Sequence, residues 1–503
     1  MTIHVLITAI PAQDITRPPG ILGILAGCCE AAGVGYDIFD LNLHMHQCLP
    51  EDICKQLTTD FLINEFRSVD NQLYYQQMCC DYLKLIQQTS PTHLAISVFT
   101  QASILAADFL LNYLKQNQID CKIIIGGLGV KNSVNQITGK QTFGEYCLSN
   151  NLIDYCVYGE GELAFVELLK GNIDYPGINQ DNQPQLLDLD VLPRPSHKKI
   201  RPEDYFYATV PELLINGSRG CVRHCTFCDV SRYWEKYIYK SGNVLASELF
   251  EAWQSTNVQK FIFSDSLVNG SIREFRKFNR QIIEYKKSHS NFDPKYIGQF
   301  ICRPASQLKD LDYAEMAQAG CEILVVGIES FSNRIRDHMK KKFSNDDIDH
   351  HFESCARYGI KNVLLMLSGY VTETLEDHEL QLEYLKKYQI YGLSRVIYAI
   401  NMEVGGLLFF QDTPLLAMQD ELQVTFPHWD LNGNREEWIS AANPLLTAKE
   451  RLRRSLEIMQ TAYDLGYKVS NFPQRIDEAD RLVSDYQWIN QHPKFEIHPS
   501  LNT

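Results

Sequence analysis

Apolar runs of strand length alternate with helix-length segments along most of the chain, and this alternation restricts the fold more than any other feature. In the first 170 residues, strands are predicted at 4–8, 36–40, 93–98, 122–126 and 155–159. Strands this apolar, each followed by a helix, are buried on both faces in a parallel sheet. The sequence therefore predicts an α/β protein that begins with a doubly wound, Rossmann-like sheet, to which segment 49–90 adds helices.

A second alternating series follows residues 171–205, which are rich in Pro, Asn, Asp and Gln and are predicted to be a surface linker. Its strands are predicted at 212–217, 260–265, 296–303, 322–328, 362–367 and 395–400. Six strand–helix units predict a partial (β/α)6 barrel, with its chemistry at the carboxyl ends of the strands. We predict a Rossmann-like domain over 1–185, the barrel over 186–411, and a mainly helical C-terminal region over 412–503 with a helix at 447–466.

The composition argues against two classes of protein. The 503 residues carry a formal net charge of -15, which disfavours a protein that coats nucleic acid or an anionic membrane. No uninterrupted apolar run approaches the roughly 18 residues that a membrane-spanning helix needs. The opening MTIHVLITAIPAQD is predicted to be a strand and not a signal peptide. We expect a cytoplasmic protein with no membrane association and no strong sign of nucleic-acid binding.

Three cysteines lie close together in the loop after the first predicted barrel strand. Cys221, Cys225 and Cys228 have the spacing Cys-x3-Cys-x2-Cys. They could be buried thiols on a helix face, but the glycines before them and the polar residues between them favour a loop. A structural zinc site needs four ligands, and His224 could serve as the fourth only by turning back within the same loop. The favoured interpretation is an iron–sulfur cluster that keeps one iron open, because it has three thiolates and not four.

The cysteine pattern, with Phe227 before the last thiol and a strand leading into the loop, resembles the signature of the radical S-adenosylmethionine (SAM) superfamily. The resemblance covers residues 212–411. It implies a [4Fe-4S] cluster on the three cysteines, SAM on the open iron, and Phe227 beside the adenine. It also implies reductive cleavage of SAM to methionine and a 5′-deoxyadenosyl radical, with the protein positioning the cofactors.

Further positions at predicted strand ends resemble SAM-binding motifs of that superfamily. Ser264 and Asp265 stand where the family has a Gly-Gly-Glu turn that binds the SAM amino group, although Asp265 equally suits a helix cap or turn. Glu329, in the motif GIES, is implied to face the SAM ribose. Either Arg303 or Arg334 is implied to pair with the SAM carboxylate.

Two later segments extend the resemblance. Gly369 and Tyr370, in LSGYVTETLED, resemble a Gly-x-Pro-Gly-Glu-Thr turn near the adenine, with Val371 in place of the proline. The segment FFQDTPL, 409–415, resembles the one that closes the barrel. An aromatic loop either caps the barrel mouth or packs a small C-terminal core. Its members are Phe426, Pro427, His428, Trp429 and Trp438.

A Rossmann-like domain before such a barrel resembles the cobalamin-binding subfamily of radical SAM enzymes. Segments 17–42, 123–130 and 154–162 resemble its opening helix and second strand, its Gly-Gly turn and its Gly-Glu-Gly-Glu segment. The glycines of that turn either let the backbone approach a cofactor at the carboxyl edge of the sheet or make a tight turn into a helix. They are Gly126, Gly127 and Gly129.

One expected feature of a cobalamin domain is missing. The Asp-x-His-x-x-Gly motif, which supplies a lower ligand to cobalt in many such domains, does not occur after the first strand. His44 and His46 are nearby polar residues but are expected in an ordinary loop. The domain therefore either binds cobalamin without a protein ligand to cobalt or keeps the fold without the cofactor.

These resemblances imply a cobalamin-dependent radical SAM enzyme that methylates an unactivated carbon or phosphorus centre. Its expected partners are a low-potential donor of flavodoxin or ferredoxin type and a small-molecule or peptide substrate; no catalytic acid or base is assigned. The alternative is a radical SAM enzyme for rearrangement, oxidation or cyclisation with a cobalamin-free N-terminal domain. A tRNA methylthiotransferase is disfavoured because it needs three more cluster cysteines and a basic RNA-binding module. A zinc-stabilised binding protein without catalysis is the alternative from another class.

Overall fold

The computed structural model describes residues 2–62, 66, 68–206, 210–393, 400–410, 412–426 and 438–469. The chain divides into two structural units. The first comprises Met1–Arg219, Tyr237–Asp265 and Arg273–Tyr296, and the second comprises Gly220–Lys236, Ser266–Ile272 and the chain from Ile297 onward.

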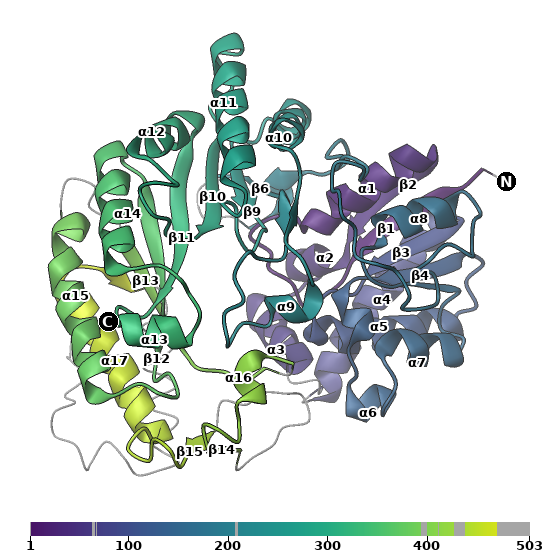
Figure 1. The fold of residues 1–503 in the computed structure, drawn as a ribbon. Helices are drawn as coiled ribbons and strands as arrows, with labels where there is room; N and C mark the ends of the chain where they lie inside the picture. The colour runs from purple at the N-terminus through teal and green to yellow at the C-terminus, as the bar shows by residue number, and fades with distance from the viewer. Residues whose placement is uncertain are drawn as a thin grey trace. The chain divides into compact units, whose positions relative to one another are not determined.

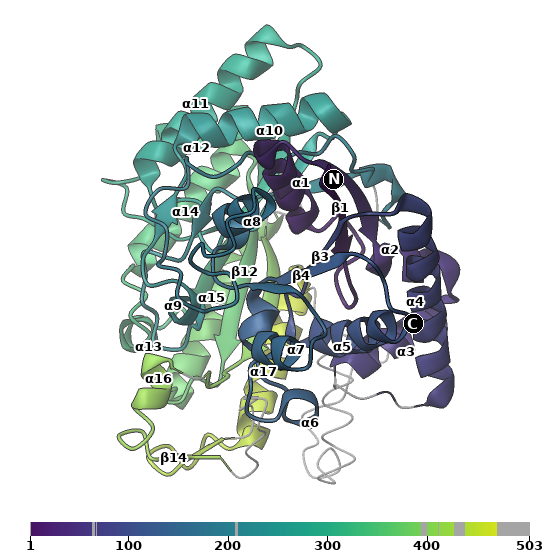
Figure 2. The same cartoon turned by 90° about the vertical axis from the view of Figure 1, so that its right-hand side faces the viewer.

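The first unit holds a five-stranded parallel sheet in the order β2-β1-β3-β4-β5 (Figures 1 and 2). Its strands are β1 (His4–Ala9), β2 (Gly35–Asp40), β3 (His93–Ser97), β4 (Lys122–Gly126) and β5 (Tyr155–Val157). Successive strand side chains point to opposite faces. Leu6 accordingly lies in one buried core, and Val5 and Ile7 lie in the other.

Helices cover both faces of this sheet. One face packs against α1 (Gly20–Ala32) and α8 (Gly161–Leu169). The other packs against α2 (Leu41–Cys48), α3 (Glu51–Leu62), α4 (Val69–Thr89), α5 (Gln101–Gln116), η1 (Leu128–Lys131) and α7 (Phe143–Ser149), and the short α6 (Asn135–Thr138) lies between the last two in sequence. The extra helices predicted within 49–90 are therefore present as α3 and α4.

The linker of residues 171–205 is irregular, as predicted, with one short 3-10 helix η2 (Pro202–Asp204). The expectation that it lies over the surface is wrong for part of it, because Leu189, Ser196 and His197 are buried. The backbone N–H of Ser196 donates to the carbonyl of Gly23 in α1 at 2.9 Å. Polar composition suggested exposure, but the backbone N–H and the hydroxyl of Ser196 are satisfied by bonds to Gly23 and Glu30.

The first unit also contains the start of the second strand–helix series. Strand β6 (Glu212–Ile215) pairs in parallel with β9 (Lys260–Phe263). Helices α10 (Gly242–Thr256) and α11 (Ile272–Ser288) accompany them, and β7 (Ser218–Arg219) forms an antiparallel pair with β8 (Ile238–Tyr239).

The second unit continues the series, with neighbouring strands in the order β16-β13-β12-β11-β10. These are β10 (Lys295–Phe300), β11 (Cys321–Glu329), β12 (Lys361–Ser368), β13 (Ile400–Gly406) and β16 (Lys468–Val469). Helices α12 (Asp310–Ala319), α14 (Asn345–Tyr358), α15 (Leu375–Leu393) and α17 (Ala448–Asp464) pack in that sequence, each against the next (Figure 1). The shorter elements are α9 (Val230–Tyr233), α13 (Asn333–His338), α16 (Pro414–Ala417), β14 (Val424–Thr425) and β15 (Ile439–Ser440).

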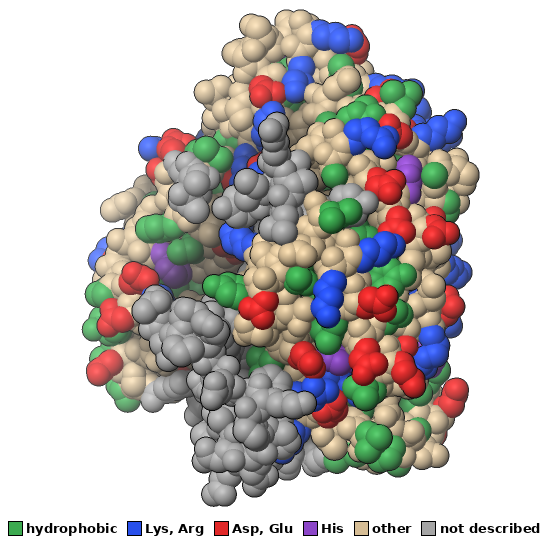
Figure 3. Space-filling view, turned by 90° about the vertical axis from the view of Figure 1, so that its left-hand side faces the viewer, with side chains coloured by type: hydrophobic (Ala, Val, Ile, Leu, Met, Phe, Trp, Pro, Cys, Tyr) green, Lys and Arg blue, Asp and Glu red, His purple; other side chains and the backbone are tan. Residues whose placement is uncertain are grey.

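The predicted fold class is confirmed: the protein is α/β, with a doubly wound N-terminal sheet and a parallel partial barrel. The predicted strand at 395–400 lies, except for Ile400, outside the described residues. No helix in the described part of the chain is long and apolar enough to cross a membrane. On the face shown in Figure 3, acidic and basic side chains are interspersed.

Candidate active site

The three cysteines lie in an irregular loop between β7 and α9, as predicted, and all three are half-buried. The chain enters the loop through Gly220, whose φ of 76° suits glycine. A Cβ at this position would lie 2.7 Å from the carbonyl oxygen of Lys236. Glycine therefore permits the sharp entry that brings the thiols into one short loop.

Thr226, between the second and third cysteines, anchors the loop. Its backbone N–H donates to the carbonyl of Met339 at 3.1 Å, and its carbonyl accepts from the N–H of Leu415 at 2.8 Å. Its hydroxyl lies 2.9 Å from the buried phenol of Tyr370, which in turn lies 2.9 Å from Nδ1 of His338. The loop that carries the thiols is thus held by three distant segments of the second unit.

Two of the three thiols, those of Cys225 and Cys228, are in an environment that favours the neutral form. Burial raises the pKa of Cys225, which Lys341 opposes, and burial raises the pKa of Cys228 to about 11. Cys221 acts electrostatically on both. Metal binding deprotonates thiol ligands and releases those protons.

No group of three His, Cys, Asp or Glu side chains in the described residues is arranged to hold a metal ion. In a cubane cluster each thiolate binds a different iron, so the sulfurs stand further apart than around one tetrahedral ion. The three half-buried thiols of one loop fit such a cluster in ligand type and number.

Glu329 stands at the end of β11, where the register against β12 shifts between Gly327 and Glu329. Its φ is 62°, which is uncommon for a residue other than glycine. Its Oε1 accepts a bond of 2.8 Å from Nζ of the buried Lys341. Burial disfavours the charged form of Lys341, but Glu329 and the thiols of Cys225 and Cys228 outweigh it and raise the lysine pKa.

Phe227, predicted to flank an adenine, is half-buried. Its ring centroid lies 5.7 Å from Nζ of Lys341. It also packs against the edge of a buried cluster that includes Phe409 and Trp438. Phe426 packs there too, so the two described aromatics of the predicted loop, Phe426 and Trp438, belong to a C-terminal core; Pro427, His428 and Trp429 lie outside the described residues.

The two arginines predicted to pair with a carboxylate lie in different elements, Arg303 in the loop after β10 and Arg334 in α13. The guanidinium of Arg303 donates to the carbonyls of Asn269 and Gly270 at 3.1 and 3.3 Å. Arg334 donates to the carbonyl of Thr372 at 2.7 Å and to Asp377. Both guanidinium groups are engaged by protein groups outside the cysteine loop.

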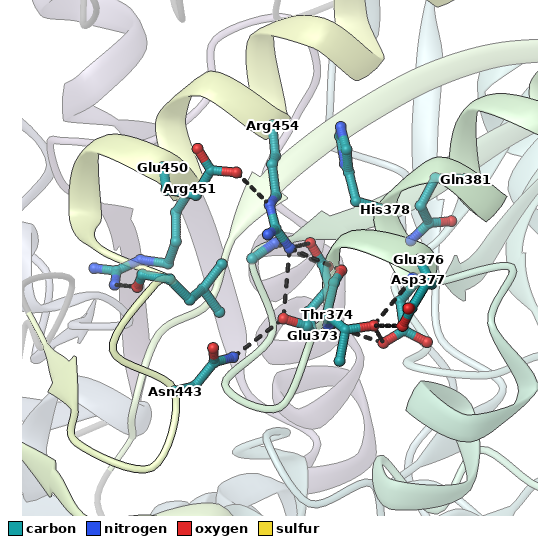
Figure 4. A network of polar contacts seen from close by, with 12 residues as sticks. Glu373, Thr374, Glu376, Asp377, His378, Gln381, Asn443, Glu450, Arg451 and Arg454 are labelled. Atoms are coloured by element: carbon teal, nitrogen blue, oxygen red, sulfur yellow. Dashed lines mark hydrogen bonds and ion pairs between the residues drawn. The ribbon is translucent and has the colours of Figure 1, made fainter.

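The turn after β12 contains Gly369 at a φ of 73°. Its N–H donates to Oε2 of the buried Glu373 at 3.1 Å, and Glu373 accepts from Nη1 of Arg454 in α17 at 3.0 Å (Figure 4). A Cβ on Gly369 would lie 2.7 Å from Cγ of Arg451. The turn is therefore covered by α17, whereas Tyr370 supports the cysteine loop through its side chain.

Ser264 and Asp265, in the first unit, follow β9. Asp265 is buried and accepts from the N–H of Gly217 at 2.9 Å and from the hydroxyl of Ser218 at 2.5 Å. Burial raises its pKa to about 6. Ser264 donates through its N–H to the carbonyl of Ile215 at 2.9 Å. Asp265 is neither a helix cap nor an exposed turn residue, but a buried acceptor for the chain after β6.

Comparison with known proteins gives a family match for most of the barrel region. Residues 215–385, which include the cysteine loop and Glu329, match the radical SAM superfamily. The chain contains a radical SAM domain. The resemblance predicted from the cysteine spacing is thereby confirmed.

Curated relatives of this radical SAM chain differ in their reactions. It is 26% identical over 262 residues to an uncharacterized methyltransferase of Pyrococcus horikoshii, and 25% identical over 208 residues to an anaerobic magnesium-protoporphyrin IX monomethyl ester cyclase of Synechocystis. It is 24% identical to cytidylyl-2-hydroxyethylphosphonate methyltransferase of Streptomyces wedmorensis. These matches cover 47%, 38% and 43% of this chain and 54%, 40% and 47% of the relatives, so the chain spans about half the length of the curated relatives it matches.

Two solved structures share the fold of this radical SAM chain. The radical SAM methyltransferase TsrM of Kitasatospora setae, with tryptophan and a SAM analogue bound, superposes with a TM-score of 0.60 at 14% identity, over 95% of this chain and 99% of TsrM. The cobalamin-dependent radical SAM enzyme OxsB, with aqua-cobalamin bound, superposes with a TM-score of 0.63 at 14% identity, over 90% of this chain and 66% of OxsB.

In the N-terminal domain of this radical SAM chain, the chain's own backbone occupies the space beside the predicted glycine turn. Gly127 has a φ of 104°, and Cβ atoms on Gly127 and Gly129 would lie 2.6 and 2.8 Å from the carbonyl oxygen of Val98. A Cβ on Gly126 would lie 3.2 Å from the carbonyl of Val157. These glycines make a tight turn into η1, which was one of the two interpretations.

The two histidines expected in a loop near this edge lie instead in helix α2, so that expectation is wrong. Asp40 caps the helix by accepting from the N–H of Leu43. Nε2 of His44 lies 3.5 Å from a carboxylate oxygen of Asp81, and burial lowers the pKa of His46.

Sequence reasoning missed Thr226, His338 and Lys341. Thr226 and His338 act through bonds to residues far along the chain, which no local pattern reveals. Lys341 is one of three consecutive lysines, 340–342, and only its burial distinguishes it.

Proposed function

We propose that this protein is a radical SAM enzyme that holds a [4Fe-4S] cluster through Cys221, Cys225 and Cys228. The single observation that carries the proposal is the loop of three half-buried thiols in a domain that matches the radical SAM superfamily. SAM held at such a cluster would supply a 5′-deoxyadenosyl radical. The protein's own part is to fix the loop through Thr226 and to exclude competing reactions by burial.

Glu329, with a carboxylate held beside the cysteine loop, is proposed to accept hydrogen bonds from the SAM ribose. Phe227 is proposed to contact the adenine, with the turn at Gly369 and Tyr370 close to it. Arg303 and Arg334 are weaker candidates for the SAM carboxylate, because both guanidinium groups already bind carbonyl groups. The same holds for Asp265 as an acceptor of the SAM amino group, since its carboxylate binds Gly217 and Ser218.

The reaction proposed is cobalamin-dependent methylation of an unactivated centre in a small-molecule or peptide substrate. Support comes from the shared fold with TsrM and OxsB, together with two methyltransferases among the curated relatives. The glycines of the β4 turn offer no cradle for cobalamin, since Val98 and Val157 occupy that space. Phe99, which follows β3 and is 54% exposed, is an apolar group at the same edge that could pack on a flat cofactor.

A second function is favoured by two observations. One of the curated relatives is a cyclase, and the glycine turn of this chain is complete without a cofactor. A radical SAM rearrangement, oxidation or cyclisation with a cobalamin-free N-terminal domain is therefore the alternative. Either reaction needs a low-potential electron donor, for which a flavodoxin or ferredoxin is proposed.

Anaerobic reconstitution with iron, sulfide and cobalamin, followed by product analysis from SAM under reductant, tests these proposals. Release of 5′-deoxyadenosine together with S-adenosylhomocysteine supports methylation, and 5′-deoxyadenosine alone with no retained cobalamin supports the alternative. Cys225→Ala is expected to lose the cluster absorbance, the bound sulfide and all SAM cleavage. Cys48→Ala, which removes an exposed thiol in α2, is the matched control and should keep all three. Activity that survives Cys225→Ala would overturn the cluster assignment.

A further inference from the structure

Three consecutive lysines, 340–342, follow α13, and the middle one differs from its neighbours in burial. Lys340 and Lys342 are exposed, whereas Lys341 is buried with 6% of its surface exposed. A buried ammonium is costly unless it is paired and hydrogen-bonded. The buried ammonium of Lys341 therefore requires acceptors inside the protein, whereas the ammonium groups of Lys340 and Lys342 are solvated.

The ammonium of Lys341 is fixed by two acceptors. It donates to Oε1 of Glu329 at 2.8 Å and to the carbonyl of Gly327 at 2.9 Å. A Cβ on Gly327 would lie 2.7 Å from that Oε1 and 2.9 Å from the lysine Nζ, so glycine leaves the space in which the pair forms. The bulge at Gly327–Glu329 and the φ of 62° at Glu329 aim the carboxylate at the lysine.

The ammonium of Lys341 also lies near the cysteine loop. Nζ lies 5.7 Å from the ring centroid of Phe227, the residue before Cys228, and it interacts electrostatically with Cys225 and Cys228. An ammonium has three protons to donate, and two are used by Glu329 and Gly327. The buried positive charge is thus held at a fixed place beside the thiols.

Fixed charges near an iron–sulfur cluster set its reduction potential, together with hydrogen bonds and solvent exposure. Reduction adds one electron from the donor to the cluster and moves no proton, so the reduced state is more negative by one charge. A nearby cation in a low-dielectric environment stabilises that state more than an exposed cation does. Lys341 is buried and Lys340 and Lys342 are not, so only Lys341 is expected to exert this effect.

We propose that Lys341 is a positioning residue for electron transfer: its ammonium, held by Glu329, raises the reduction potential of the cluster bound by the three cysteines. This inference rests on the proposed function, because it needs the cluster. The carboxylate of Glu329 acts in the opposite direction, and the potential reflects the balance between the two charges.

The test is an anaerobic redox titration of the reconstituted full-length protein without SAM, followed by electron paramagnetic resonance. Lys341→Met keeps the unbranched shape and most of the length of the side chain and removes its charge, and it should shift the midpoint potential to a more negative value. Lys340→Met and Lys342→Met, which remove the same charge at exposed positions, should leave the midpoint unchanged. Lys341→Arg should stay near wild type. Iron and sulfide contents are measured for every variant.

A second set of variants distinguishes an effect of the Lys341 charge from a structural disturbance caused by Lys341→Met. Glu329→Gln should shift the midpoint in the positive direction, and Lys341→Met combined with Glu329→Gln should return it toward wild type. The double variant also avoids an unpaired buried charge, so it remains informative if Lys341→Met does not fold.

Equal midpoints for Lys341→Met and Lys342→Met, or a Glu329→Gln shift in the negative direction, overturn the proposal. A wild-type protein that binds no iron and sulfide overturns the proposed function instead, so the two failures are distinguishable.

Discussion

The turn after β4 and the turn after β12 look alike in sequence and differ in what occupies them. Each follows a parallel strand and contains a glycine at positive φ. Close approach to a ligand was one of two interpretations of the first turn, and the second resembles a turn near the adenine of SAM. At Gly127 the neighbouring space is taken by the main-chain carbonyl of Val98. At Gly369 it is taken by the side chain of Arg451 from α17.

Because of this difference, a substitution can clear the space beside Gly369 but not the space beside Gly127. Val98 is bonded to the turn through both of its backbone groups, from its own N–H to Gly126 and from the N–H of Gly129 to its carbonyl. It cannot move without disturbing the sheet. At Gly369 the space is filled by the side chain of Arg451, whose guanidinium stacks on Trp438 at 3.8 Å from the ring centroid. This side chain can be truncated by substitution without changing the backbone. A glycine at a strand end therefore indicates close approach, and only the structure shows what approaches.

The largest effect is expected from removing the anchor that holds α17 over the second turn. Arg454 is 4% exposed and binds the buried Glu373 at 3.0 Å and Glu450 at 2.8 Å (Figure 4). Arg454→Met leaves Glu373 buried and unpaired, which should cost about 3–5 kcal/mol in the free energy of unfolding. Urea unfolding followed by circular dichroism measures it.

The adjacent Arg453 is the matched control for that measurement. It is more exposed, and its ion-pair partners among the described residues are Glu450 and Glu457, both on its own helix. Arg453→Met should cost about 1 kcal/mol or less, as exposed ion pairs do. Equal losses for the two variants would mean that the buried network does not hold α17 in place.

A smaller effect is expected at the first turn. Gly127→Ala forces a non-glycine residue to a φ of 104° and places its Cβ 2.6 Å from the Val98 carbonyl. The free energy of unfolding should fall by about 3 kcal/mol. Gly33→Ala, at a φ of 70° with nothing within 4 Å of the added Cβ, isolates the backbone strain and should cost about 1 kcal/mol. The same urea titration compares them, and equal costs would argue against crowding by Val98.

The smallest expected effect is a coupling free energy between two substitutions at one turn, and it tests most directly whether a side chain or the backbone fills each turn. Gly369→Ala crowds Arg451, so Arg451→Ala should recover about 1 kcal/mol of the stability that Gly369→Ala loses. Val98→Ala should recover nothing of the loss from Gly127→Ala, because the obstructing carbonyl remains. Double-mutant cycles from thermal or urea unfolding measure both couplings. Rescue at both turns would show that the two are filled in the same way.

Much of the fold could be predicted because its signals are local. The apolar runs predicted ten of the strands close to their observed positions, and the cysteine spacing predicted the candidate cluster loop. Hydrophobic periodicity and metal-ligand spacing each depend on a few neighbouring residues. Segment 171–205 shows the limit, because its polar residues are buried by partners more than a hundred positions away, as in the bond between Ser196 and Glu30.

The candidate site was less predictable for the same physical reason. Glu329 could be singled out because it ends an apolar strand, but its partner Lys341 is identical in sequence context to Lys340 and Lys342. Gly127 signals a special backbone conformation, yet Val98, which fills the space, lies in another strand connection. The sequence indicates candidate residues such as Glu329, but their contacts with Lys341 or Val98 depend on the tertiary structure.

The attachments of Thr226 also bear on how the protein matures. Its hydroxyl pairs with Tyr370, 144 residues later, and its carbonyl accepts from Leu415. During synthesis the cysteine loop emerges well before these partners, since the chain is made from its N-terminus. The thiols can therefore be arranged for a cluster only after the chain through Leu415 has folded. Insertion of the proposed cluster is therefore expected after this part of the chain has folded, and not as an event that nucleates folding.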